Sequence, residues 1–299
     1  MNSFMGQNEI VLSNGNKMPT FGLGTYKTQN EQEMTNLIRT ALDIGYRYID
    51  TARYYENEHM IGAALQTIFK EGKYKREDIF LVTKQFPDKG VKCSEVFKQQ
   101  LKDLQVDYVD LLLIHFPFNP PSDDYKQWNH KPVHQIWAEF EEIHRLGLVK
   151  GLGVSNFNCQ MVIDLLVYCK VRPVVNQIEL HIFNQQTNFV EFLKKINVYP
   201  VGYSPMAKYN EVINNQTVQN IAKKYNATVA QVLISFMVQQ GVVVIPKTEK
   251  PERLKPNFES QKLVFSNEDL ITLKNLNTNT RIVDFQLYPE FFKGIPFYE

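Results

Sequence analysis

The segment GYRYIDTARYYENE, residues 45–58, contains one complete strand-to-helix unit. Gly45 is the residue type that most often ends a helix, and the run at 46–49 that follows it predicts a β-strand. Asp50 follows this strand, Tyr55 lies on the loop beyond it, and a helical apolar pattern comes next. A helix, a strand and a second helix in direct succession are typical of α/β proteins built on a parallel sheet.

The segments on either side of this unit have the 3.6-residue apolar spacing of amphipathic helices. We expect Asn30 with Glu33 to cap the start of the first helix, which runs from Glu31, and Gly45 to end it. Its apolar stripe is formed by Met34, Leu37, Ile38, Ala41 and Leu42. A second predicted helix has one side formed by Asn57, Ile61, Ala64, Leu65 and Ile68. A third, which ends before Gly147, has a stripe of Ile136, Phe140, Ile143 and Leu146 or one of its neighbours.

Eight short runs rich in β-branched and apolar residues recur along the chain, and helix-length segments separate most of them. The runs are residues 21–26, 46–49, 79–82, 109–114, 152–154, 174–178, 198–203 and 242–245. Eight strand-then-helix units in 299 residues fit an α/β fold of the closed (β/α)8 barrel type better than an open sheet. The pattern alone leaves a doubly wound open sheet as the alternative.

Two segments lie outside this repeat. Asn14-Gly15 between short apolar segments predicts a β-hairpin with a two-residue turn that would cap one end of the barrel. An aromatic tail follows the last helix, with Phe285, Tyr288, Phe291, Phe292, Phe297 and Tyr298. The most loop-like internal stretch is residues 117–132, and no linker interrupts the chain, so we expect residues 1–299 to form a single domain.

The composition is that of an ordinary globular protein of nearly neutral charge. A hydrophobic content of 43% argues against global disorder, and a net charge of +1 argues against nucleic acid or a membrane as the main partner. Cys93, Cys159 and Cys169 show no CxxC spacing, so we expect reduced thiols in the cytoplasm and no metal site. Residues 1–10 are too polar for a signal peptide, and no apolar run approaches the roughly 18 residues of a membrane-spanning helix. We expect a soluble monomer or dimer.

Hydrogen-bonding and titratable side chains follow nearly every predicted strand. In a parallel barrel these positions meet at one mouth, where active sites lie. From the second strand onward they are Asp50, Thr83 with Lys84, His115, Ser155 with Asn156, Gln177, Tyr203 with Ser204, and Lys247 with Thr248. We therefore expect a functional site at this mouth.

Tyr55 lies five residues past Asp50 and could reach back over the barrel mouth. A tyrosine, whose ordinary pKa is near 10, is a poor acid–base group at neutral pH unless a nearby cation stabilises its phenolate. Lys84 could supply that cation and lower the pKa of Tyr55, and Asp50 could hold Lys84 charged. His115 would then orient or polarise a substrate oxygen.

Each of these residues also has an ordinary structural explanation. Asp50 could be a helix N-cap, and Lys84 could be a solvated loop lysine. Tyr55, beside Tyr54, could be a packing aromatic, and His115 taken alone is more often a hydrogen-bonded structural histidine. These explanations weaken together because all four residues are placed for one mouth.

Seven segments resemble the aldo-keto reductases in order and spacing: GYRYIDTARYYENE, LVTKQF, DYVDLLLIHFP, GLVKGLGVSNF, VVNQIELH, GYSPMA and VIPKTEKPERLKPNF. The resemblance covers nearly the whole chain and implies a (β/α)8 barrel. It implies a catalytic tetrad of Asp50, Tyr55, Lys84 and His115, in which Tyr55 protonates the carbonyl oxygen while NADPH delivers hydride to carbon. Histidine at position 115 resembles the members that reduce carbonyls, whereas glutamate there marks members that reduce a conjugated double bond. The implied substrates are aldehydes or ketones, with aldoses among the candidates.

The resemblance also implies the cofactor and substrate contacts. Ser155, Asn156 and Gln177 would contact the carboxamide, and Tyr203 would stack on the nicotinamide. The remaining cofactor-binding residues are Thr25, Asp50 and Ser204, the 2′-phosphate group Lys247, Thr248 and Arg253, and Asn257 at the adenine. The substrate pocket would be lined by Tyr26, Tyr54, Phe86, His115 and Phe116. Lys and Arg suit a doubly charged phosphate, although a basic loop by itself would be interpreted as a solvated one.

The sequence departs from the family pattern at several positions. Tyr26, Phe86 and Phe116 stand where tryptophan is common, which predicts an aromatic but altered pocket. Pro256 stands where a glutamate often contacts the adenine amino group, which predicts looser adenine selectivity. Residues 205–215 lack the usual small side chains, which weakens the expected grip on the pyrophosphate.

Two other functions remain as alternatives. A Schiff-base aldolase is also a barrel with a lysine at a strand end and would use Lys84 as its nucleophile. An ion pair with Asp50 argues against it, because a paired lysine stays protonated. The other alternative is a non-catalytic regulatory protein that binds the cofactor and keeps the reductase fold, which the complete tetrad disfavours.

Overall fold

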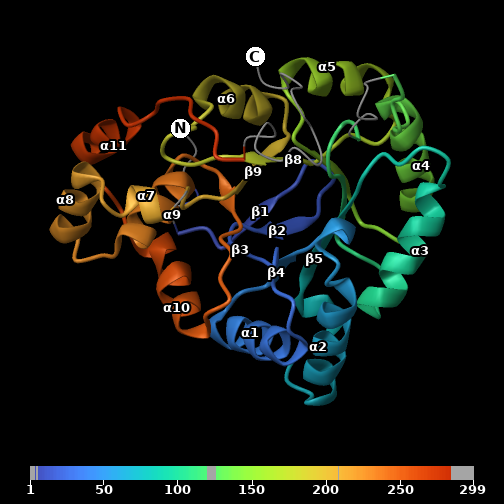
Figure 1. Ribbon diagram of the computed structural model, residues 1–299, viewed down its shortest axis with the longest axis horizontal. Helices are drawn as coiled ribbons and strands as arrows, with labels where there is room; N and C mark the ends of the chain where they lie inside the picture. Colours follow the sequence, from blue (N-terminus) through green and yellow to red (C-terminus); the bar gives the residue numbers. More distant parts are fainter. Residues whose placement is uncertain (1–3, 5, 120–125, 208, 284–299) are drawn as a thin grey trace.

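The computed structural model describes residues 4, 6–119, 126–207 and 209–283. Eight parallel strands form its centre, and helices surround them on the outside (Figure 1). The strands are β3 (Gly22–Gly24), β4 (Tyr48–Asp50), β5 (Phe80–Gln85), β6 (Leu111–Ile114), β7 (Leu152–Ser155), β8 (Val175–Glu179), β9 (Tyr199–Tyr203) and β10 (Val243–Val244). Each strand pairs with the next along the chain, and parallel bridges from Phe21 to Val244 and from Gly24 to Lys247 join the first strand to the last. The predicted closed barrel is confirmed, and the open sheet is excluded.

All eight predicted strands are present, with small differences in their bounds. The largest difference is at β5, which continues through Gln85, so that Lys84 lies inside the strand and not after it. The reason is long-range pairing, because Lys84 and Gln85 align with Leu113 and Ile114 of β6.

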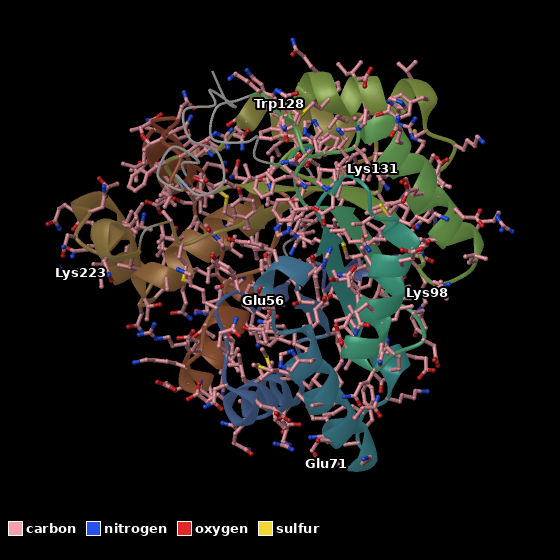
Figure 2. The ribbon with its side chains drawn as sticks, turned by 45° about the vertical axis from the view of Figure 1, so that its right-hand side comes forward. Glu56, Glu71, Lys98, Trp128, Lys131 and Lys223 are labelled. Carbon is pink, nitrogen blue, oxygen red and sulfur yellow. The ribbon has the colours of Figure 1, made fainter. Side chains whose placement is uncertain are left out.

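The outer layer contains the predicted amphipathic helices. Its helices are α1 (Glu31–Ile44), α2 (Glu58–Lys70), α3 (Cys93–Leu104), α4 (Val133–Arg145), α5 (Cys159–Tyr168), α6 (Thr187–Lys195), α7 (Tyr209–Val212), α8 (Gln216–Lys224), α9 (Val229–Gln239), α10 (Pro251–Glu259) and α11 (Asn267–Lys274). Three 3-10 turns accompany them: η1 (Arg53–Tyr55), η2 (Arg76–Asp78) and η3 (Ser260–Lys262). Charged side chains such as Glu71, Lys98 and Lys223 project outward from this layer (Figure 2).

The predicted ends and stripes of the helices are largely confirmed. The side chain of Asn30 accepts the backbone N–H of Glu33, and Gly45 ends α1 at a φ of 124°, a conformation that favours glycine. The stripe of α4 differs at one position: Leu146 is half exposed, whereas Trp137 is buried. The reason is that α4 ends at Arg145, so its last turn lacks the periodicity that the pattern assumed.

The predicted hairpin is formed by β1 (Glu9–Val11) and β2 (Lys17–Pro19), but its connection covers residues 12–16 instead of two residues. The side-chain amides of Asn14 and Asn16 both donate to the carbonyl of Lys150, which precedes β7. The turn is therefore shaped by this long-range contact, and the hairpin covers the amino-terminal end of the barrel. The predicted aromatic tail, from Phe285 to Tyr298, lies outside the described residues, as does part of the 117–132 loop.

Candidate active site

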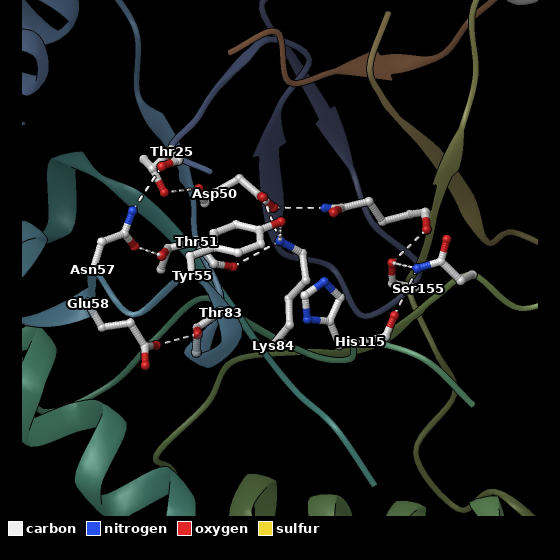
Figure 3. Close-up of polar contacts among 12 residues, drawn as sticks. Thr25, Asp50, Thr51, Tyr55, Asn57, Glu58, Thr83, Lys84, His115 and Ser155 are labelled. Carbon is white, nitrogen blue, oxygen red and sulfur yellow. Dashed lines mark hydrogen bonds and ion pairs between the residues drawn. The ribbon is translucent and has the colours of Figure 1, made fainter. Parts of the chain in front are cut away.

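Lys84 is the centre of the polar cluster at the carboxyl-terminal mouth of the barrel. Its ammonium donates to Asp50 Oδ1 at 2.6 Å, to the carbonyl of Thr51 at 2.9 Å and to Tyr55 Oη at 3.2 Å (Figure 3). The side chain is 0% exposed. Burial alone would lower the pKa of Lys84, but the charge of Asp50 and the Tyr55 hydroxyl outweigh it, so the pKa is raised. Lys84 is therefore a protonated cation held in a fixed position.

Tyr55 is carried to this cluster by η1, the short turn that follows β4. Burial raises the pKa of its phenol, and although Lys84 opposes this effect, the net pKa stays above the ordinary value. Lys84 lowers the pKa of Tyr55, as predicted, but its contribution is smaller than that of desolvation. Desolvation outweighs the single cation, and Tyr55 is fully protonated at neutral pH, the form that a proton donor requires.

His115 follows β6, and its ring centre lies 5.7 Å from that of Tyr55. The side chain is buried, and burial together with the nearby Lys84 charge holds its pKa well below the ordinary value. The imidazole is therefore neutral. Among the described residues no hydrogen-bond partner is present for its Nδ1. A neutral, buried ring beside the phenol can orient an oxygen atom without adding a second positive charge.

A chain of hydrogen bonds connects the cluster to the strands across the barrel. Gln177 Nε2 donates to Asp50 Oδ2 at 2.8 Å, and Ser155 Oγ donates to the carbonyl of Gln177 at 2.8 Å. Asn156 Nδ2 donates to the carbonyl of His115 at 2.9 Å and to Ser155 Oγ at 3.1 Å. The network makes the relative positions of these side chains depend on the barrel itself, which is rigid.

A second buried network of hydrogen bonds contacts the backbone of Lys84. Glu58 Oε1 accepts the hydroxyl of Thr83 and the amide of Gln100 at 2.9 Å, and Gln100 also donates to the carbonyl of Lys84. Burial raises the pKa of Glu58 to about 7. Asn57 links the neighbouring loops by donating to the carbonyl of Thr25. The sequence stretch that ends in Asn57 and Glu58 thus supplies both the phenol and the residues that hold its surroundings.

A cavity of about 430 Å³ opens above this cluster. Fourteen of the predicted site residues line it: Thr25, Tyr26, Asp50, Tyr54, Tyr55, Phe86, His115, Phe116, Ser155, Asn156, Gln177, Tyr203, Ser204 and Lys247. Lys84 lies beneath it and reaches it through Tyr55. The aromatic side is continuous, with ring centres 5.0 Å apart for Tyr26 and Tyr55 and 5.5 Å apart for Phe86 and Phe116. The predicted aromatic pocket is therefore brought together with the polar cluster.

Three predicted cofactor residues do not line this cavity. Thr248 lies on the β10–α10 loop, where its hydroxyl oxygen accepts the backbone N–H of Lys250. Arg253 and Asn257 lie on α10, the first exposed and the second buried. Of the residues predicted to surround the 2′-phosphate, only Lys247 lines this cavity, because the chain leaves the barrel after β10.

The sequence interpretation missed several residues of the cavity wall. Pro205, Met206 and Ala207 follow β9, and the backbone of Ala207 has a φ of 53°. Ile282 and Val283 come from the far end of the chain. The segment after β9 was singled out only for lacking small residues. The pair after the last helix carries no periodic signal that could have identified it.

Glu179 explains how the end of the chain reaches the cavity. Its carboxylate, at the end of β8, accepts the backbone N–H groups of Ile282 at 2.6 Å and Val283 at 2.9 Å. His181 lies 2.8 Å from the same carboxylate and accepts the N–H of Phe183 on its other ring nitrogen. Glu179 is thus a positioning residue that fixes part of the pocket wall.

The lining of the cavity fits a nicotinamide dinucleotide. Its amide and hydroxyl side chains suit a carboxamide, the face of Tyr203 suits a flat ring, and Lys247 suits a phosphate. The hydroxyl of Tyr203 donates to Asn156 Oδ1 at 2.8 Å, which fixes the position of that ring.

Comparison with known proteins agrees with this geometry. Residues 20–278 match the sequence model of the Aldo/keto reductase family. "Aldose reductase C" of Dictyostelium discoideum is 38% identical over 99% of this chain and 97% of its own length. The solved aldose reductase of Schistosoma japonicum superposes with a TM-score of 0.85 at 30% identity, over 93% of this chain and 95% of its own. A Bombyx mori aldo-keto reductase, solved in complex with NADP, gives a TM-score of 0.85 at 28% identity, over 94% and 96%.

The chain belongs to the aldo-keto reductase family. It is an NADP-dependent oxidoreductase that acts on carbonyl groups, and NADPH is its cofactor.

Within the described ranges, no helix combines the length and the apolar character that crossing a membrane requires. The same part of the chain contains no group of three or more His, Cys, Asp or Glu residues that could hold a metal ion.

Proposed function

We propose that this protein reduces aldehydes or ketones, aldoses among them, with Tyr55 as the proton donor. The observation that carries the proposal is the contact of Tyr55 Oη with Lys84 Nζ at 3.2 Å, beneath a cavity that His115 also lines. Tyr55 is protonated because desolvation raises its pKa, and Lys84 is charged because it is paired with Asp50. These are the states that reduction of a carbonyl needs.

When bound, NADPH would supply the hydride for the carbonyl carbon. Tyr55 gives its phenolic proton to the oxygen as negative charge develops there. Lys84, 3.2 Å away, stabilises the phenolate that remains, and Asp50 keeps Lys84 charged and oriented. The neutral imidazole of His115 orients the carbonyl oxygen toward the phenol.

We assign the cofactor contacts from the family resemblance, and the lining of the cavity supports most of them. Ser155, Asn156 and Gln177 would hold the carboxamide, and Tyr203 would stack on the ring. Thr25, Asp50 and Ser204 line the same cavity. Lys247, Thr248 and Arg253 would surround the 2′-phosphate, with Asn257 at the adenine. Thr248, Arg253 and Asn257 lie beyond the cavity, which agrees with a dinucleotide that extends outward from the barrel mouth.

The shape of the pocket indicates the class of substrate. Tyr26, Tyr54, Phe86 and Phe116 give it aromatic walls, and its polar lining includes Tyr55. Such a site places a carbonyl group against the phenol and packs the rest of the molecule on ring faces. Several relatives are named aldose reductases, which makes aldoses the first polyhydroxylated substrates to test.

The aldolase alternative meets a physical obstacle at Lys84. A Schiff-base lysine must lose its proton to attack a carbonyl, whereas Lys84 has a raised pKa and three acceptors around its ammonium. We further propose that residues 1–299 form one domain and that the protein acts in the cytoplasm, which suits its three free cysteines.

The test is a panel of aldehydes, ketones and aldoses assayed by the loss of NADPH absorbance. Turnover of at least one class supports the proposal. Borohydride trapping of a substrate on Lys84, without NADPH consumption, would replace it with the aldolase.

A further inference from the structure

The cation that lines the cavity, Lys247, is paired with a carboxylate, that of Glu249. Lys247 Nζ lies 2.7 Å from Glu249 Oε1. The side chains are 35% and 48% exposed, respectively, so both can be reached by a ligand. Lys247 lines the cavity, and Glu249 is on the loop that leads from β10 to α10. The charge that would meet a phosphate is therefore already paired within the chain.

We infer that Glu249 narrows the preference for NADPH over NADH, because it competes with the 2′-phosphate for Lys247 and can itself bind a ribose hydroxyl. The inference rests on the proposed function, in which Lys247 contacts the 2′-phosphate. It assigns to Glu249 the role of a specificity-determining residue for the cofactor.

The competition follows from the charges. A phosphate that approaches Lys247 must either displace the Glu249 carboxylate or share the ammonium with it. In the first case an ion pair is lost, and in the second two anions lie close together. Both outcomes weaken binding of NADPH, and the exposure of the pair keeps the effect moderate. Lys250 on the loop and Arg253 on α10 add positive charge, which further reduces the loss of NADPH affinity. Glu252 on α10 adds negative charge.

NADH avoids this conflict. Its adenosine ribose carries a 2′-hydroxyl, which can donate a hydrogen bond to a carboxylate and brings no charge. The pair between Lys247 and Glu249 can then stay intact. Glu249 therefore disfavours one cofactor and accommodates the other, so its removal should change the ratio of the two affinities more than their mean.

The experiment compares Glu249→Gln with the wild type by titrating NADPH and NADH against protein fluorescence. Glu252→Gln is the matched control, because it removes the same charge from an exposed position in the first turn of α10. We expect Glu249→Gln to tighten NADPH binding by roughly two- to fivefold and to leave NADH binding unchanged or weaker. The control should change the ratio by less than about twofold, and added salt should reduce the difference.

A double-mutant cycle with Lys247→Met tests whether Glu249 acts through Lys247. The gain in NADPH affinity on Glu249→Gln should shrink when Lys247 is absent. Equal changes for both cofactors, or an effect no larger than that of Glu252→Gln, would overturn the inference. If the wild type bound neither cofactor, the proposed function would fail together with it, whereas NADPH binding that is insensitive to Glu249 would overturn this inference alone.

Discussion

Replacing Tyr55 with phenylalanine removes one hydroxyl group from the centre of the polar cluster. The ring would remain packed against Tyr26 and His115, whose centres lie 5.0 Å and 5.7 Å from it. Lys84 would lose its contact at 3.2 Å but keep Asp50 at 2.6 Å and the Thr51 carbonyl at 2.9 Å. The fold should therefore lose only about 1 kcal/mol of stability, the value of one hydrogen bond.

The catalytic loss should be much larger than the structural one. General acid catalysis contributes about 100- to 10,000-fold, or about 2.7 to 5.5 kcal/mol in the barrier. We expect turnover of Tyr55→Phe to fall by at least about 100-fold. NADPH affinity should stay nearly unchanged, because the substitution removes little of the cavity surface.

The assay measures turnover by NADPH absorbance and cofactor affinity by fluorescence in the same preparations. Tyr54→Phe is the matched control: it removes a hydroxyl from the neighbouring position, which is 41% exposed and lines the same cavity. This control should retain most of its turnover. Near wild-type turnover in Tyr55→Phe, or an equal loss in both variants, would show that Tyr55 is not the proton donor.

Three further changes test the remaining parts of the site. Lys84→Met should depress turnover at every accessible pH, because it removes the cation that opposes the raised pKa of Tyr55. Asp50→Asn should act in the same direction but more weakly. Unchanged pH–rate profiles in both variants would contradict the coupling of Tyr55 to Lys84 and Asp50. NADPH should bind more tightly than NADH. Arg253→Ala should weaken NADPH binding more than NADH binding, by roughly 1.5 to 3 kcal/mol, the value of a charge-assisted contact. Equal affinities of the wild-type protein for NADPH and NADH in fluorescence titrations would contradict the assignment of the phosphate site. Glu58 has a folded pKa of about 7 against an ordinary value of 4.5, so its contribution to stability is present below about pH 4.5 and is lost as pH rises through 7. Glu58→Gln should therefore reduce the fall in stability between these pH values, by on the order of 1 to 3 kcal/mol, in denaturant titrations at pH 5 and pH 8; a fall as steep as that of the wild type would show that Glu58 is not the group responsible.

The sequence by itself predicted the strands and the centre of the site, and its resemblance to a known family favoured the closed barrel over an open sheet. Strand and helix periods are local properties of the chain, and they identified all eight strands. Because parallel strands end at one mouth, the residues that follow them could be grouped without coordinates, as Asp50 and His115 were. The resemblance to a known family then turned this group into a specific reaction.

Tertiary structure decided the properties that depend on what surrounds each group. The pKa of Tyr55 is set by desolvation, which no count of nearby charges in the sequence could provide. Glu179 holds Ile282 across 103 positions of the chain, and no pattern records that contact. The pairing of Lys247 with Glu249 is close in sequence, yet only the direction of the loop after β10 brings the two charged atoms to 2.7 Å. Position along the chain determines which residues can meet at the mouth of the barrel, whereas packing and burial determine their charge states and their hydrogen-bond and ion-pair partners.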